Sequence, residues 1–227
     1  MAGSGFGTNF RITTWGETHG AGVGVVVDGC PAGLPLERED VQKYLDRRKP
    51  GQSKYTTQRK EGDQVEILSG IFEGRTTGTP ISMVVYNKDQ RSKDYSNIKD
   101  IYRPGHADFT FDMKYGFRDY RGGGRSSGRE TIGRVAAGAV AAKVLKELGI
   151  EIKAYAKAIA GIEVSKDHFD FAEMNNNPFN MPDKEAAKLV QEKADQMIKE
   201  MDSIGGIIEC QITGMPVGIG ETVFDKL

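Results

Sequence analysis

The chain has 227 residues, which is enough for one large domain or two small domains with a buried core. Its 31 Lys and Arg residues nearly balance its 32 Asp and Glu residues, and the net charge is −1. This balance argues against a general nucleic-acid-binding or membrane-surface protein, because such proteins carry a strong net field.

Targeting and redox signals are weak in this sequence. The N-terminal stretch lacks the basic start and apolar block of a signal peptide, and the longest apolar run, residues 23–27, is too short to span a bilayer. The two cysteines, Cys30 and Cys210, lie far apart and form neither a disulfide framework nor a metal-ligand spacing. We expect a soluble cytoplasmic protein with two buried thiols and no metal site.

In the first half of the chain, apolar runs predict strands at residues 23–28, 65–72 and 81–86. Residues 37–48 place apolar side chains at helical spacing, and the Pro-Gly pair that follows predicts the end of that helix. Residues 87–124 are polar, basic and rich in glycine. A connection of that length predicts a functional loop region.

The second half of the chain begins with a helix signal. Ser127 and Glu130 have the spacing of a capping box, and Gly149 predicts the helix end. One face of this helix carries small residues, so we expect it to be central and buried. The pattern further predicts two strands within residues 150–164, an amphipathic helix at 183–201 and a strand at 207–212. The side chains expected to face inward from the second helix are Ala186, Leu189, Val190, Met197 and Ile198.

Two segments of the chain repeat one pattern. A strand followed by Gly-x-Pro-x-Gly and an aliphatic residue occurs at residues 29–34 and again at residues 214–219. One interpretation is two unrelated turns, since Gly and Pro are common there. We favour a duplicated unit, in which residues 1–227 form a single domain, incomplete at its C-terminus, with the second repeat starting near residue 206.

Histidine is the natural proton carrier near neutral pH, and the chain has three. His168 lies among charged residues and is expected to be a solvated surface side chain. His19 and His106 instead lie in turns bounded by Gly or Pro-Gly, where the backbone can approach a ligand. These two are candidate catalytic residues, and the alternative for each is an imidazole that only caps a turn.

Basic residues form two groups. The first group flanks the turn after residue 49 and contains Arg47, Arg48, Lys49, Lys54, Arg59 and Lys60. The second group contains Arg118, Arg121, Arg125, Arg129 and Arg134. Arg125 and Arg129 flank a predicted helix N-terminus after three glycines, which is the chemistry of a phosphate site. No Gly-Lys-Ser/Thr follows the glycines, so this is not a Walker A loop.

Four ordered stretches resemble signatures of the chorismate synthase family: residues 16–31, 46–59, 103–108 and 125–131. The resemblance covers essentially the whole chain. Thr18 stands where the family usually has Ser, and Gly128 where it usually has Ala. The family's third signature, Arg-x-Asp-Pro-like, has no counterpart, so we expect the C-terminal third to be missing and the chain alone to be incomplete as an enzyme.

The resemblance implies an α+β fold in which helices are sandwiched between two antiparallel sheets, internally pseudo-duplicated, with the second unit truncated. It implies a homotetramer that binds neither nucleic acid nor membranes. The implied activity is that of a carbon–oxygen lyase acting on a phosphate. It converts 5-enolpyruvylshikimate 3-phosphate to chorismate by 1,4-anti elimination, the last common step of the shikimate pathway to aromatic amino acids. Reduced FMN is required without net redox, with NADPH as a possible reductant.

The resemblance also implies residue roles. His19 would be the acid beside the departing phosphate, and His106 would support the reduced flavin. The side chains implied to clamp the phosphorylated small-molecule substrate are Arg48, Arg103 and Arg129. Those implied to bind the cofactor are Arg125, Ser126 and Ser127, with Arg48 and Lys54.

Two alternatives belong to other classes. Residues 120–125 resemble an Arg-Gly box, and such segments bind single-stranded RNA. A single occurrence in a nearly neutral chain makes this the weaker interpretation. The other alternative is a flavoprotein that uses FMN for redox chemistry, although the chain has no dinucleotide-binding fingerprint.

Overall fold

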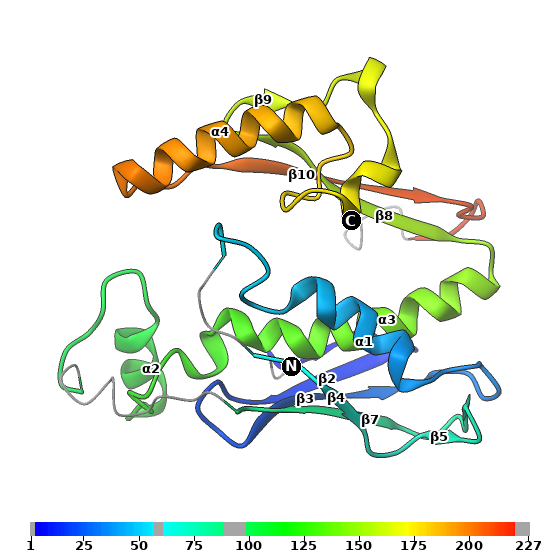
Figure 1. The fold of residues 1–227 in the computed structure, drawn as a ribbon. Helices are drawn as coiled ribbons and strands as arrows, with labels where there is room; N and C mark the ends of the chain where they lie inside the picture. Colours follow the sequence, from blue (N-terminus) through cyan, green and yellow to red (C-terminus); the bar gives the residue numbers. More distant parts are fainter. Residues whose placement is uncertain (1–2, 57–60, 89–98, 221–227) are drawn as a thin grey trace. The chain divides into compact units, whose positions relative to one another are not determined.

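The computed structural model describes residues 3–56, 61–88 and 99–220 (Figure 1). The chain forms two compact units, Met1–Gly51 with Gln58–Val144 and Gln52–Thr57 with Leu145–Leu227. Each unit combines helices with an antiparallel sheet, which confirms the expected α+β class. None of the helices in the described ranges is long and apolar enough to cross a membrane.

The first unit is built on a five-stranded antiparallel sheet. In spatial order its strands are β1 (Gly5–Phe6), β2 (Arg11–Gly16), β3 (Gly22–Asp28), β7 (Ile81–Tyr86) and β4 (Val65–Ile67). A separate hairpin pairs β5 (Ile71–Phe72) with β6 (Arg75–Thr76). The single strand expected at residues 65–72 is therefore wrong, because Gly70, at φ +81°, turns the backbone between β4 and β5.

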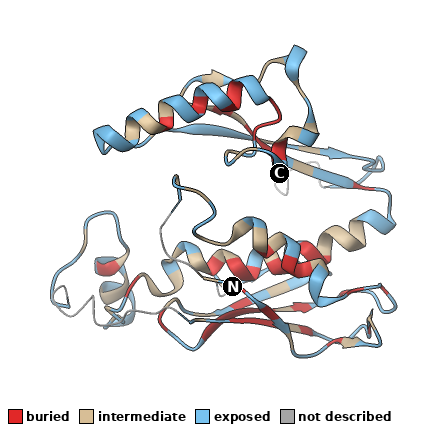
Figure 2. Ribbon diagram, viewed as in Figure 1, coloured by how far each residue is buried: buried red, intermediate tan, exposed pale blue. Residues whose placement is uncertain are grey.

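Helices α1 (Arg38–Arg48) and α3 (Thr131–Glu147) cover one face of this sheet (Figure 1). Central strand β3 turns Val23, Val25 and Val27 into the core between them, and Figure 2 shows the buried stripe along α3. At Gly133 an added Cβ would lie 3.0 Å from the carbonyl oxygen of Gly24. The small residues of α3 thus let it lie close to the sheet, as expected for a central, buried helix.

The start of α3 differs from the expected capping box. Ser127 Oγ does accept a hydrogen bond from the Arg129 N–H at 3.3 Å. The buried Glu130 carboxylate instead accepts from Thr14 Oγ1 at 2.6 Å and from Arg134 Nε at 3.0 Å. Glu130 therefore fastens the helix to strand β2, because its side chain points into the sheet rather than back to Ser127.

The second unit has a three-stranded sheet in the order β10 (Gly206–Thr213), β8 (Glu151–Ile159) and β9 (Ile162–Glu163). Its helix α4 (Lys184–Glu200) begins after Asp183, whose Oδ1 accepts hydrogen bonds from two backbone N–H groups of the first turn. Its core joins the helix to the sheet through Ala156, Met181, Ala186, Ala187 and Val190.

The described residues also form short 3-10 helices, which are η2 (Gly124–Ser126), η3 (Gly128–Glu130), η4 (Lys166–His168) and η5 (Phe171–Asn175).

Two expectations for the second unit are wrong. Leu189 and Ile198, expected to face inward, are about half exposed, and the buried stripe of α4 runs through Ala187 and Ala194 instead. Packing through alanines overrode the hydropathy pattern because small side chains let the helix lie close to the sheet. Cys210, expected to be buried, is exposed on edge strand β10.

Several elements carried no sequence signal. Strands β1 and β2 lie in a polar, Gly-rich N-terminus, and they form because β3 offers a pairing partner to β2 and β2 offers one to β1. Helix α2 (Asp108–Tyr115) lies inside the region expected to be irregular, and it ends at Gly116, in the left-handed conformation. Arg59 and Lys60 of the first basic group lie outside the described residues.

The repeated Gly-x-Pro-x-Gly pattern has a counterpart in the backbone. Gly29 follows β3 at φ +79°, and Gly214 follows β10 at φ +74°. An added Cβ would lie 1.7 Å from the Asn9 oxygen in the first case and 2.0 Å from the Gly149 oxygen in the second. The Asn9 carbonyl lies just before β2, which pairs with β3. The Gly149 carbonyl lies just before β8, which pairs with β10. The duplicated unit within one domain stays a prediction.

Candidate functional site

His19 lies in the turn between β2 and β3 and is only 7% exposed. The loop of three glycines covers it: an added Cβ on Gly122 would lie 2.5 Å from His19 Cδ2 and 2.8 Å from Nε2. Gly122 also has φ +94°, a conformation that favours glycine. Both the backbone angle and the close approach therefore require glycine at this position.

Arg103 connects this loop to the start of α2. Its Nη2 donates to the Gly122 carbonyl oxygen at 2.9 Å, and its Nε and Nη2 each donate to the Asp108 carboxylate at 2.8 Å. These hydrogen bonds from the Arg103 side chain hold the pKa of Asp108 well below its usual range. The ion pair, only 17% and 7% exposed at its two side chains, therefore fixes the loop over His19.

His106 lies three residues after Arg103, and it is exposed. Its Nδ1 is 3.1 Å from the carbonyl oxygen of Pro104. The structure thus places Arg103 against the loop that covers His19, whereas it presents His106 to solvent at the turn before α2. The His168 side chain is about half exposed, which confirms that it lies at the surface as expected. Its Nδ1 lies 3.3 Å from Glu185 Oε2.

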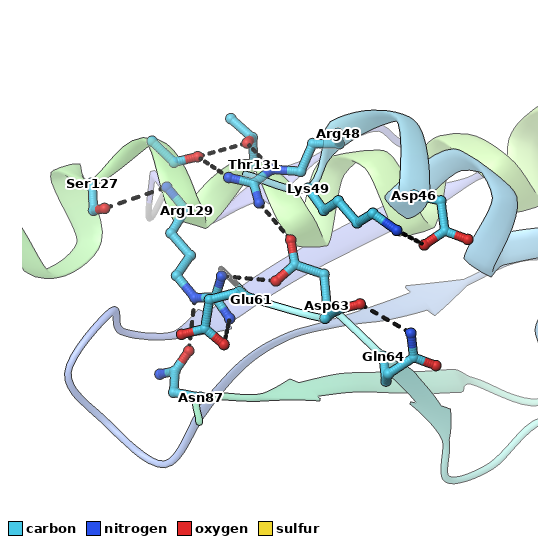
Figure 3. A network of polar contacts seen from close by, with 12 residues as sticks. Asp46, Arg48, Lys49, Glu61, Asp63, Gln64, Asn87, Ser127, Arg129 and Thr131 are labelled. Atoms are coloured by element: carbon cyan, nitrogen blue, oxygen red, sulfur yellow. Dashed lines mark hydrogen bonds and ion pairs between the residues drawn. The ribbon is translucent and has the colours of Figure 1, made fainter. Parts of the chain in front are cut away.

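Arg48 and Arg129 meet at one carboxylate (Figure 3). Asp63, whose side chain is 0% exposed, accepts from Arg48 Nη1 through Oδ2 and from Arg129 Nη1 through Oδ1, both at 2.8 Å. Arg48 also donates to the Gly128 carbonyl oxygen and to Thr131 Oγ1, each at 3.3 Å. The last residue of α1 is thereby joined to the start of α3.

Asn87, just after β7, joins Arg129 to the His19 turn. Its Oδ1 accepts from Arg129 Nε at 2.8 Å. Its Nδ2 donates to the carbonyl oxygens of Glu17 and Gly20 at 2.8 and 2.9 Å. The loop that carries His19 and the arginine pair therefore belong to one hydrogen-bond network.

The predicted cofactor residues at the start of α3 already have partners within the chain. The Arg125 guanidinium donates to the Gly16 oxygen at 3.0 Å and to Thr14 Oγ1 at 2.7 Å. Ser126 Oγ donates to the Gly123 oxygen at 2.6 Å, and Ser127 Oγ caps η3. Arg125 thereby holds the glycine loop to strand β2, and the two serines bond within the turn itself.

A cavity of about 650 Å³ opens beside this loop. Its lining combines the glycine loop and Arg125 with three aromatic side chains of the α2 region, Phe111, Tyr115 and Phe117. The carboxylates of Glu17, Asp108, Asp119 and Glu130 also line it, and a mixture of apolar surface with polar groups is typical of a ligand site.

Lys54 is the one predicted site residue in the second unit. Its Nζ lies 2.7 Å from Asp195 Oδ1, and the hydrogen bond to Asp195 raises the pKa of Lys54. The neighbouring Tyr55 also donates to Asp195, at 2.9 Å. The structure therefore groups Lys54 with α4.

Sequence analysis missed three residues of this site. Asp63 stands among charged residues with no motif around it, and Asn87 ends a strand, so neither had a signal in a single sequence. Gly122 was one of three consecutive glycines. Its φ of +94° and its contact with His19 distinguish it from Gly123, whose φ is −86° and whose added Cβ would meet its nearest atom at 3.3 Å.

A comparison with protein families decides the relationship. The sequence model of the family described as chorismate synthase matches residues 10–227. The chain belongs to the chorismate synthase family. The solved crystal structure of a chorismate synthase is similar in fold, with a TM-score of 0.74 and 30% identity, covering 96% of this chain and 61% of that one.

Curated chorismate synthases from bacteria and an archaeon are similar along the whole chain. That of Lachnospira eligens is 69% identical over 227 residues, and that of Agathobacter rectalis is 63% identical over the same length. That of Methanococcoides burtonii is 58% identical over 229 residues. The chain spans 62% of the length of the first two relatives and 63% of the third.

Proposed function

We propose that this chain is part of an enzyme that eliminates phosphate from 5-enolpyruvylshikimate 3-phosphate to give chorismate. The match to the chorismate synthase family over residues 10–227 carries this proposal. In a 1,4-anti elimination the C–O bond to phosphate breaks with its electron pair, and a proton leaves the opposite face of the ring. The reaction has no net redox change.

The departing phosphate needs cationic donors in a closed site, and Arg48 and Arg129 offer them. Their side chains are 21% and 10% exposed. Arg129 Nη2 is buried and makes no hydrogen bond among the described residues, and the Glu61 carboxylate pairs with it at 3.7 Å. A buried donor of this kind is costly unless a ligand meets it, which supports a role in binding an anion. Arg103 would bind substrate from the neighbouring loop, beside its pair with Asp108.

His19 would donate the proton that the departing phosphate takes up. Burial beneath Gly122 fixes its imidazole, and the network through Asn87 links its turn to Arg129. A positioned acid of this kind contributes about 10²–10⁴ to a rate. His106, exposed before α2, would act on the cofactor side.

The residues beside the cavity fit the chemistry of FMN. Aromatic side chains suit its flat ring, and the turn of Arg125, Ser126 and Ser127 suits a charged group. The role of Lys54 in binding the cofactor stays a prediction from the family resemblance. When bound, reduced FMN would supply electron density as the C–O bond to phosphate breaks and would regain it as the C–H bond breaks, so no net redox occurs. Reduction by NADPH and a homotetrameric assembly remain predictions from the family resemblance, and a cytoplasmic location remains a prediction from the sequence.

The RNA-binding alternative has less support. Arg121 of the Arg-Gly segment forms a two-pronged ion pair with Asp119, at 2.6 Å for the shortest contact, and Gly122 packs on His19. The segment is therefore engaged within the fold. Any RNA affinity should be weak and should fall steeply with salt.

The test uses the complete protein that carries this chain. Phosphate release should require reduced FMN, and equal turnover with oxidised FMN and no reductant would refute the proposal. His19→Ala should lower kcat about 10²–10⁴-fold while substrate and FMN still bind. His106→Ala should change the spectrum of bound reduced FMN, and His168→Ala, on the surface of the second unit, is the control. Reversed effects of the first two variants would reverse the assigned roles.

A further inference from the structure

The residues that accept hydrogen bonds from Arg129 are not among the predicted site residues. Its Nη1 meets Asp63 and its Nε meets Asn87, each at 2.8 Å. Its Nη2 is buried, with no hydrogen-bond acceptor among the described residues, and the Glu61 carboxylate lies 3.7 Å away (Figure 3). Hydrogen bonds from the protein thus hold two edges of the guanidinium, and the third donor faces Glu61 in an ion pair that is too long for a hydrogen bond.

Asp63 fixes the angle between two arginines. One fully buried carboxylate uses Oδ1 for Arg129 and Oδ2 for Arg48. Its backbone lies at φ +41°, a left-handed conformation that is uncommon for a residue other than glycine. Such strain persists only where the surroundings enforce it, and it concentrates at functional sites.

Asn87 fixes the distance from Arg129 to the His19 turn. Its amide has one possible orientation, because the carbonyls of Glu17 and Gly20 need the NH₂ group and the guanidinium needs the oxygen. No other assignment of the amide atoms satisfies all three contacts.

We propose that Asp63 and Asn87 are positioning residues that hold Arg48 and Arg129 in register with His19 for the phosphate group of the substrate. This inference rests on the proposed elimination of phosphate. Neither residue touches substrate in this proposal, since both act through the arginines and through the turn that carries His19.

Net charge and positioning predict opposite results for Asp63. Arg48 and Arg129 carry two positive charges, and their ion-pair partners Asp63 and Glu61 carry two negative charges. Removal of the Asp63 carboxylate makes the net charge of this group positive, so simple electrostatics predicts tighter binding of an anion. Positioning predicts weaker binding, because an asparagine can accept from only one of the two guanidinium groups and leaves the other without its fixed orientation.

The experiment measures KM and kcat of phosphate release in the complete protein, well below the melting temperature of each variant. Asp63→Asn and Asn87→Ala should each raise KM about tenfold or more, the usual worth of a hydrogen bond to a charged group. The control is Asp46→Asn on α1, whose half-exposed carboxylate pairs with Lys49. In a double-mutant cycle, Asp63→Asn should raise KM less in an Arg129→Lys background than in the parent protein, because its effect on KM acts partly through that arginine.

A lower KM for Asp63→Asn, kinetics like those of Asp46→Asn, or fully additive effects with Arg129→Lys would overturn the inference. If Asp63→Asn does not fold, Asn87→Ala decides by the same measurement. If the parent protein shows no turnover at all, the proposed function fails instead. The inference is then decided by binding of inorganic phosphate, which should be weaker in both variants than in the parent and the control.

Discussion

Gly122 is the residue whose replacement tests the site geometry most directly. Its φ is +94°, and an alanine held there would lower the free energy of unfolding by about 1–2 kcal/mol, because a left-handed conformation is unfavourable for an L-residue with a Cβ. The new Cβ would also lie 2.5 Å from His19 Cδ2, where ordinary contacts begin at 3.4 Å, so the imidazole or the loop must retreat by about 0.9 Å. Such overpacking typically costs a further ~1–3 kcal/mol.

Gly124→Ala is the matched control. Gly124 also has a positive φ, +53°, but the nearest atom to its added Cβ is Glu17 Oε2 at 3.8 Å. It therefore carries the backbone cost without the clash. We expect Gly122→Ala to unfold in urea with a free energy lower than that of Gly124→Ala by about 1–3 kcal/mol. In the complete protein, a displacement of about 1 Å at the proposed acid should slow phosphate release by about 100-fold.

Imidazole signals in a ¹H–¹³C NMR spectrum give a second measurement, because the chain has only three histidines. The His19 signal should move in Gly122→Ala and stay in Gly124→Ala. Equal stability of the two variants with an unchanged His19 signal would show that the loop does not pack on the imidazole, and the described site would be wrong.

Three further predictions concern stability. Gly138→Ala on α3 should raise the free energy of unfolding in urea by about 0.5–1 kcal/mol, because the added Cβ meets nothing within 4 Å. Gly133→Ala should lower that free energy, because its Cβ would crowd the Gly24 oxygen, and equal effects of the two variants would contradict this packing. Asp108→Asn should cost about 3 kcal/mol at pH 7. Because the folded pKa of Asp108 is depressed by its hydrogen bonds from Arg103, that difference should shrink as pH falls below 3.8, and a difference constant with pH would refute the ion pair. Asp183→Ala should lower the stability of the second unit by about 1 kcal/mol or more through loss of the α4 cap, and an unchanged melting temperature would contradict that role.

The sequence alone determined the local elements whose cause is local. Hydrophobic periodicity located α1, α3 and α4, and the β-branched run located β3, because side-chain spacing and caps act within a few residues. The same signals misplaced the inward stripe of α4, since Leu189 is more hydrophobic than Ala187 but too large for close packing on the sheet. The sequence also named His19, Arg48 and Arg129 as candidate site residues, because motifs and charge clusters are written along the chain.

Only the tertiary structure decided how those residues are held. Asp63 and Arg129 are 66 positions apart and are joined by a hydrogen bond of 2.8 Å. Asn87 reaches across 70 positions to the carbonyl of Glu17, and Gly122 lies against His19. A lone Asp, Asn or Gly has no pattern that reveals such contacts. They arise because the sheet and the start of α3 bring distant segments together, and a buried guanidinium must then find its acceptors wherever the fold supplies them.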